Sequence, residues 1–113
     1  MENDGQWQQA LNIYTESLSY SPTHYKLRVS IGQTQRLLGN YKESIKIFED
    51  LIKAVPIAGE WNFELAKSYF TDGNRTKALE HLEIVLNVWE NADATYKPAI
   101  EAREKWTQWN QIN

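Results

Sequence analysis

The chain has 113 residues, 42% of them apolar and 24% charged, which fits one globular domain. Its net charge of -3 and isoelectric point near 5.4 argue against general nucleic-acid affinity, which needs a broad basic face. It has no apolar run of the about 20 residues that span a bilayer, no basic and apolar leader segment and no cysteine, so neither membrane insertion nor thiol chemistry is expected and a cytoplasmic location is favoured.

A period of 34 residues organises the chain. Gly5, Gly39 and Gly73 stand 34 residues apart, and each is followed at fixed offsets by a small residue, a ring or leucine, and an aliphatic residue. The matched positions are Ala10, Ser44 and Ala78, then Tyr14, Phe48 and Leu82, then Leu18, Ile52 and Leu86. Such a period is typical of stacked supersecondary units whose neighbours complete each other's core.

Apolar residues at helical spacing predict six helices, of which the first two are separated by a proline turn. The first runs from Trp7 to Leu18 and ends before Ser21-Pro22. The second runs from about Tyr25 to Leu38, and Gly39 is expected to cap it in the left-handed conformation.

The third predicted helix begins at Asn40, where Glu43 three residues later indicates a capping box. It ends before Pro56, because proline removes a hydrogen-bond donor and clashes with the preceding turn.

Three more helices follow at the same spacing. The fourth spans about Glu60 to Thr71 and stops at Asp72-Gly73, and the fifth spans about Arg75 to Trp89. The sixth runs from about Thr95 to Trp109, with Pro98 tolerated in its first turn.

Short loops between these segments predict antiparallel helical hairpins, and no β-type alternation competes. Gly32 and Ala66 hold equivalent sites in the second and fourth helices. Small side chains at one offset let two helices approach closely while a large ring opposite fills the gap. The expected fold is therefore an all-α solenoid of antiparallel helix pairs.

These residues resemble the tetratricopeptide repeat family. Its signature is matched twice, by Ile31-Gly32, Gly39-x-Tyr41, Ser44, Phe48 and Pro56, and again by Leu65-Ala66, Tyr69, Gly73, Ala78 and Leu82. The departures are Arg28 in place of tryptophan or leucine, Gln35 in place of tyrosine, and Glu90 in place of the closing proline. The resemblance implies a right-handed α-solenoid of antiparallel helix pairs that recognises proteins or peptides.

The register divides the single domain of residues 1–113 into four parts. They are a half repeat over 5–22, repeats over 25–56 and 59–90, and a capping helix over 95–110. Because the first unit lacks an upstream helix, we interpret the chain as part of a longer protein, with Met1 as an introduced start. The segment from Leu82 to Trp109 resembles the closing helices of such repeats in multidomain bacterial signalling and hydrolytic proteins, so a bacterial parent is expected.

No catalytic motif is present, whether a phosphate-binding glycine loop, His-Glu-x-x-His or Gly-x-Ser-x-Gly. His24 is interpreted as part of a helix start and His81 as a solvated or edge residue, while Glu80 and Glu83 form an ordinary surface pair. The sequence therefore predicts no enzyme, no cofactor and no metal.

The resemblance implies a concave groove lined by the second and fourth helices. The candidate groove residues are Lys26, Val29, Gln33, Arg36, Leu37, Glu60, Phe63, Lys67 and Phe70. Residues 21–42 contain four lysine or arginine residues and no carboxylate, which favours an acidic peptide with apolar anchors. In the alternative interpretation these cations are merely solvated and the phenylalanines complete the core.

One ligand of the family is not expected. Members that clamp the C-terminal carboxylate of heat-shock chaperones use lysine and asparagine at groove sites where this sequence has Val29, Gln33 and Glu64.

The second hypothesis is an architectural or self-association module, including a homodimer. Trp7, Leu11 and Tyr14 lie on a first helix with nothing upstream to cover it, and Trp7 is the ring most expected to be exposed. Trp106 and Trp109 share a face of the last helix, which either docks a partner or closes the core.

Overall fold

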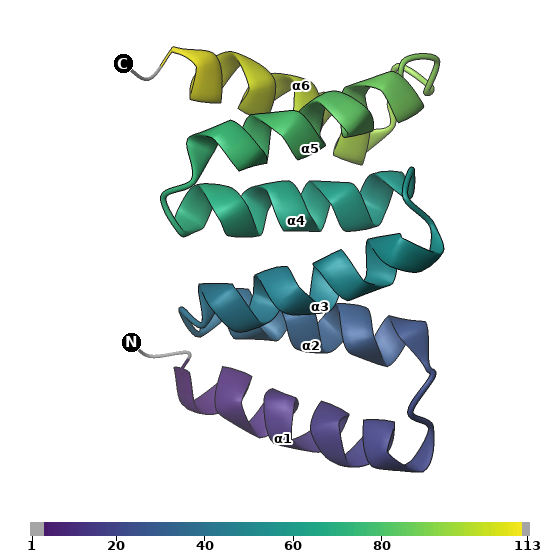
Figure 1. Ribbon diagram of the computed structural model, residues 1–113, viewed down its shortest axis with the longest axis vertical. Helices are drawn as coiled ribbons and strands as arrows, with labels where there is room; N and C mark the ends of the chain where they lie inside the picture. Colours follow the sequence, from purple (N-terminus) through teal and green to yellow (C-terminus); the bar gives the residue numbers. More distant parts are fainter. Residues whose placement is uncertain (1–3, 112–113) are drawn as a thin grey trace.

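The computed structural model describes residues 4–111 and contains six helices, with no strand in that range (Figure 1). The helices are α1 (Asp4–Tyr20), α2 (Tyr25–Leu37), α3 (Tyr41–Ala54), α4 (Gly59–Thr71), α5 (Arg75–Val88) and α6 (Lys97–Asn110). Successive helices run antiparallel and stack from α1 at one end to α6 at the other, in a molecule of 38 × 30 × 26 Å (Figure 1). The predicted all-α solenoid is confirmed.

Two of the three periodic glycines terminate helices. Gly39 and Gly73 have φ values of 88° and 89°, in the left-handed region that glycine enters without steric cost. Backbone hydrogen bonds close each cap. Asn40 N donates to Gln35 O at 2.8 Å after α2, and Asn74 N donates to Tyr69 O at 2.9 Å after α4. The predicted glycine caps after the second and fourth helices are confirmed.

Gly5 behaves differently, because it lies inside α1. The first helix thus begins at Asp4, three residues before the predicted start at Trp7. The last helix begins at Lys97 rather than Thr95, because the Asp93 carboxylate accepts bonds from the Thr95 amide and hydroxyl and holds a turn there.

The capping box predicted at Asn40 is wrong. Asn40 is the N-cap of α3, but its side chain makes no capping bond and instead donates to Gln35 Oε1 at 2.7 Å. Asn74, one repeat later, does cap its helix by accepting from Lys77 N at 3.1 Å. His24 caps α2 through Nδ1, as expected of a residue at a helix start.

The core depends on the small residues of the repeat. A Cβ atom on Gly32 would lie 2.6 Å from Phe48 Cε2, so α2 and α3 are as close as glycine allows. Ala66 and Ala78 are fully buried between α4 and α5, and Ser44 shares a buried 2.8 Å hydrogen bond with Ser68. The predicted close contact at the small positions is confirmed.

The apolar stripe of α1 is turned inward. Leu11 is buried and Trp7, Tyr14 and Leu18 are half-buried, and α1 packs on α2. The expectation that this face is uncovered and that Trp7 is exposed is therefore wrong. The exposed apolar residues of α1 are instead Ile13 and Tyr20, on a largely polar surface.

Candidate binding groove

Helices α2, α4 and α6 border one face of the molecule, and three hollows lie along this face. The first hollow, between α2 and α4, has a volume of about 330 Å³ and is lined by Tyr25, Lys26, Val29, Ser30, Gln33, Glu60 and Trp61. The middle hollow, between α4 and α6, has about 290 Å³ and is lined by Glu60, Phe63, Glu64, Lys67, Trp89, Tyr96, Pro98 and Glu101. The last hollow has about 540 Å³ and is lined by Arg36, Lys67, Phe70, Thr71, Glu101, Lys105, Gln108 and Trp109.

The three hollows adjoin one another through shared lining residues, and together they are here called the α2–α4–α6 groove. Glu60 borders the first and middle hollows. Lys67 and Glu101 border the middle and last hollows.

A buried carboxylate lies at the centre of the groove. Glu64 accepts from Arg36 Nη2 at 2.8 Å and from Gln33 Nε2 at 3.2 Å, and its Oε1 lies 3.1 Å from Lys67 Nζ. Burial by itself would raise the pKa of Glu64, but the charges and hydrogen bonds of Lys67 and Arg36 outweigh it and hold that pKa below the ordinary value of 4.5. Glu64 is therefore an ionised group that ties α2 to α4.

Aromatic rings form much of the remaining groove wall. Phe70 and Trp109 stack with ring centroids 4.4 Å apart, and Lys67 Nζ lies 4.4 Å from the Phe63 centroid. Trp89 meets Tyr96 edge to face at 5.4 Å, so α4, α5 and α6 are locked together beneath the groove.

Eight of the nine predicted groove residues line a hollow, and Leu37, 49% exposed, does not. Val29 and Phe63 are nevertheless buried and belong to the core, so they expose only an edge to a ligand. The cations of α2 are also less available to a ligand than the sequence indicates, because Arg36 forms an ion pair with Glu64.

The sequence did not predict that α6 contributes a wall of the groove. Tyr96, Glu101, Lys105 and Gln108 all line the groove. The available signal was the period itself, since a helix after the second complete repeat occupies the position of the next first helix. The sequence also did not predict the role of Glu64, because two of its three partners lie 28 and 31 residues away in the chain.

The residues nominated for self-association are mostly covered within the chain. Trp109 is 4% exposed and belongs to the core around α4 and α5, so it is not available to a partner, and Trp106 packs half-buried against the same core. This agrees with the alternative that these rings close the core.

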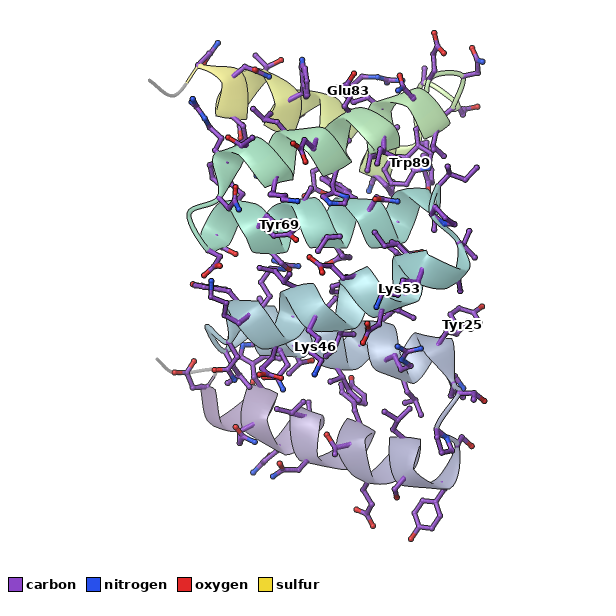
Figure 2. All side chains as sticks on the ribbon, in the orientation of Figure 1. Tyr25, Lys46, Lys53, Tyr69, Glu83 and Trp89 are labelled. Atoms are coloured by element: carbon purple, nitrogen blue, oxygen red, sulfur yellow. The ribbon has the colours of Figure 1, made fainter. Side chains whose placement is uncertain are left out.

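A separate polar cluster lies on the opposite side of α4, where Figure 2 shows Tyr69. Tyr69 donates to Glu49 Oε1 and stacks on His81 at 5.6 Å, and His81 Nδ1 lies 3.0 Å from Asn62 Oδ1. Burial, then Lys77, lowers the pKa of His81. His81 is thus a half-buried residue at the edge of the core, which agrees with its interpretation as an edge residue and not with a fully solvated one.

Two classes of site are missing from the part of the chain that the structure describes. No helix there combines the length and apolar character needed to cross a bilayer. Residues 4–111 also hold no group of three or more histidine, cysteine or carboxylate side chains placed to bind a metal ion.

Comparison with known proteins gives a family match for part of the chain and a fold for the whole of it. A tetratricopeptide repeat family profile matches residues 3–56. Protein O-mannosyl-transferase TMTC1 from Homo sapiens is 27% identical over 86 residues, which are 76% of this chain. The match spans only 10% of that protein, so this chain is similar to a small part of it.

Two solved structures have the same architecture. The MamA RS-1 ArsTM double mutant matches with a TM-score of 0.66 and 19% identity, over 96% of this chain and 68% of that one. MamA 41-end from Desulfovibrio magneticus RS-1 matches with a TM-score of 0.71 and 18% identity, over 96% of this chain and 67% of that one. Residues 3–56 thus match the tetratricopeptide repeat family, and the chain as a whole has the tetratricopeptide repeat fold.

Proposed function

We propose that this chain is a non-catalytic interaction module that binds an extended segment of a partner protein in the α2–α4–α6 groove. The observation that carries the proposal is that three adjoining hollows lie along α2, α4 and α6 and share Glu60, Lys67 and Glu101 as lining residues. Tetratricopeptide repeats generally mediate protein interactions, and the groove offers both charged and aromatic side chains to a peptide.

The dimensions suit a short peptide. The helices that line the groove stack along the longest dimension of the molecule, 38 Å (Figure 1), which takes at most about 11 extended residues. A catalytic role has less support, because the charged groups at the centre of the groove form an ion-pair network and not an acid and base with separated pKa values.

A random dodecapeptide library, panned on the purified chain, tests the proposal. Selected peptides should shift the amide resonances of α2, α4 and α6. Gln108→Trp fills the last hollow and should weaken the binding of these peptides. Glu83→Trp introduces the same side chain at an exposed site of α5 (Figure 2) and should leave their binding unchanged. Peptides that shift only the amide resonances of α3 and α5, or the absence of any binding peptide, would contradict the proposal.

A second candidate function rests on an apolar edge. Most exposed large apolar side chains among residues 4–111 lie where α1 meets α2, α3 meets α4 and α5 meets α6, on the right in Figure 1. They are Tyr20, Tyr25, Val55, Ile57, Val88 and Tyr96. Such an edge favours an architectural module that packs on a neighbouring domain or on a second copy.

Light scattering tests the self-associating form of this candidate. If a second copy covers the edge, the chain should reach twice its 13.2 kDa mass at high concentration, and Ile57→Lys should return it to the monomer. A monomer at every concentration would exclude the homodimer and leave the groove proposal unaffected.

A further inference from the structure

The last hollow carries more positive than negative charge. Arg36, Lys67 and Lys105 line it, against the single carboxylate of Glu101. Glu64, behind it, is shared by Arg36 and Lys67. Lys105 makes no ion pair with any residue that the structure describes, although its side chain is half-buried. A net positive charge therefore remains beside Lys105.

Arg36 also has an unused donor at this place. Its Nη2 donates to Glu64, but its Nε is buried and has no hydrogen-bond partner. A buried donor without an acceptor is unfavourable, and a guanidinium group is suited to bind carboxylates through two of its nitrogens. A second carboxylate in the hollow would offset the charge of Lys105 and lie beside the Arg36 guanidinium, which lines the same hollow.

The hollow offers an apolar surface next to these cations. The stacked rings of Phe70 and Trp109 both line it, and Phe70 is only half-buried. In an extended peptide, side chains two positions apart point to the same side. A volume of about 540 Å³ has room for two such side chains, one beside the cations and one on the rings.

The carboxylate is expected from within the peptide and not from its end. The last and middle hollows share Lys67 and Glu101 as lining residues, so an extended chain bound across both would pass beyond the cations. The residue pattern also differs from a clamp for a chain terminus, because Arg36 and Lys105 lie outside the sites where such clamps hold lysine and asparagine.

We propose that the last hollow selects an aspartate or glutamate side chain and an apolar side chain two residues apart in an extended segment of the partner. Lys105 and Arg36 bind the carboxylate, and the half-buried ring of Phe70 binds the apolar side chain. This inference rests on the proposed groove function and specifies which partner sequence the groove accepts.

The test uses the whole chain and a random dodecapeptide library with amidated C-termini as the probe. Wild-type selections should be enriched in the acidic and apolar pair. Glutamate to glutamine in a selected peptide should weaken its binding about tenfold, the effect of losing one or two partly exposed ion pairs. Lys105→Glu should weaken the same peptides by at least as much and shift new selections to lysine or arginine at that position.

Lys46→Glu is the matched control, because Lys46 is an exposed lysine of α3 without an ion pair among residues 4–111, outside the groove (Figure 2). It changes net charge equally and should leave affinity and selection unchanged. Circular dichroism should show both variants folded, since neither removes a partner of a buried charge.

The outcomes separate this inference from the general one. Groove-bound peptides with no acidic preference, or equal effects of Lys105→Glu and Lys46→Glu, would overturn the acidic motif and leave the groove function standing. Binders found only in a library with free carboxyl termini would overturn the internal carboxylate. The absence of any groove binder would overturn both proposals.

Discussion

Gly32 shows how one residue determines the distance between two helices. It lies on α2 directly against the ring of Phe48, which is completely buried and has no space to move away. A side chain at this site must therefore displace the ring or separate α2 from α3.

Gly32→Ala is expected to destabilise the protein by about 1–3 kcal/mol through overpacking, and Gly32→Leu at least as much. The matched control is Gly5→Ala, because a Cβ atom there meets nothing within 4 Å. Gly5→Ala should be neutral or stabilising by up to about 1 kcal/mol, since alanine favours helix. Urea denaturation measures both, and equal effects would contradict the close contact.

Glu64 is the second residue on which much depends, because three donors from α2 and α4 converge on its carboxylate. Removing its charge leaves Arg36 and Lys67 without an anion in a partly buried place. The cost should depend on pH, since only the ionised carboxylate makes these pairs.

Glu64→Gln should lower the free energy of unfolding by about 1–3 kcal/mol at neutral pH. The folded pKa of Glu64 is lowered, so its contribution is complete above the ordinary value of 4.5 and is lost as the pH falls through the folded pKa. The difference in the free energy of unfolding between wild type and Glu64→Gln should therefore disappear at acid pH. Urea denaturation at a series of pH values measures it.

Glu60→Gln provides the control for this series, because Glu60 is exposed and has no ion pair within residues 4–111. The free energy of unfolding of Glu60→Gln should equal that of the wild type at every pH of the series. A gap for Glu64→Gln that stays constant from neutral to acid pH would show that the carboxylate is not ionised in the folded state.

At the scale of elements, α6 acts as the last member of the stack. Ala99, Ala102 and Trp109 are buried, while most of its other residues are exposed. Within residues 4–111, α6 thus covers α5 with one side and leaves its other side exposed. Its start at Lys97 could not be predicted from periodicity, because the Asp93–Thr95 turn precedes it.

Trp109→Ala should cost about 3–5 kcal/mol, the range for truncating a fully buried aromatic ring. Trp106→Ala, in the same helix, should cost clearly less because Trp106 is only half-buried. Thermal or urea denaturation of the two variants compares them. Equal losses would mean that the two rings contribute alike and that Trp109 has no special place in the core.

At the scale of the whole molecule, burial is concentrated in the middle of the stack. The buried residues of α4 are Gly59, Asn62, Phe63, Glu64, Leu65, Ala66 and Ser68, whereas α1 has only Leu11 buried. Stability in a solenoid is approximately a sum of units and their interfaces, so helices with one neighbour open more easily than those between two.

Hydrogen exchange should therefore be slowest in α4 and fastest in α1. Leu65→Ala should lower the global free energy of unfolding by about 2–5 kcal/mol, whereas Leu11→Ala should mainly speed exchange in α1. Mass spectrometry of exchanged peptides reads both effects. Equal protection of α1 and α4 would indicate a single cooperative unit and contradict this gradient.

Much of the fold was readable from the chain alone because its determinants are local and repeated. Gly39 and Gly73 mark turns that need a positive φ, and Gly32, Ser44, Ala66 and Ala78 mark close helix contacts at a constant period. These requirements act within one repeat unit and leave their pattern in the order of residues.

Only the tertiary structure decided which charges meet and which faces are covered. Glu64 finds Arg36 and Gln33 across 28 and 31 residues, α6 supplies a wall of the groove, and the stripe of α1 turns toward α2. Periodicity shows that a face is apolar, but not which neighbour covers it. Charge pairing and groove shape depend on how separate helices stack, so the sequence could not show that Arg36, one of the predicted groove cations, is paired with Glu64.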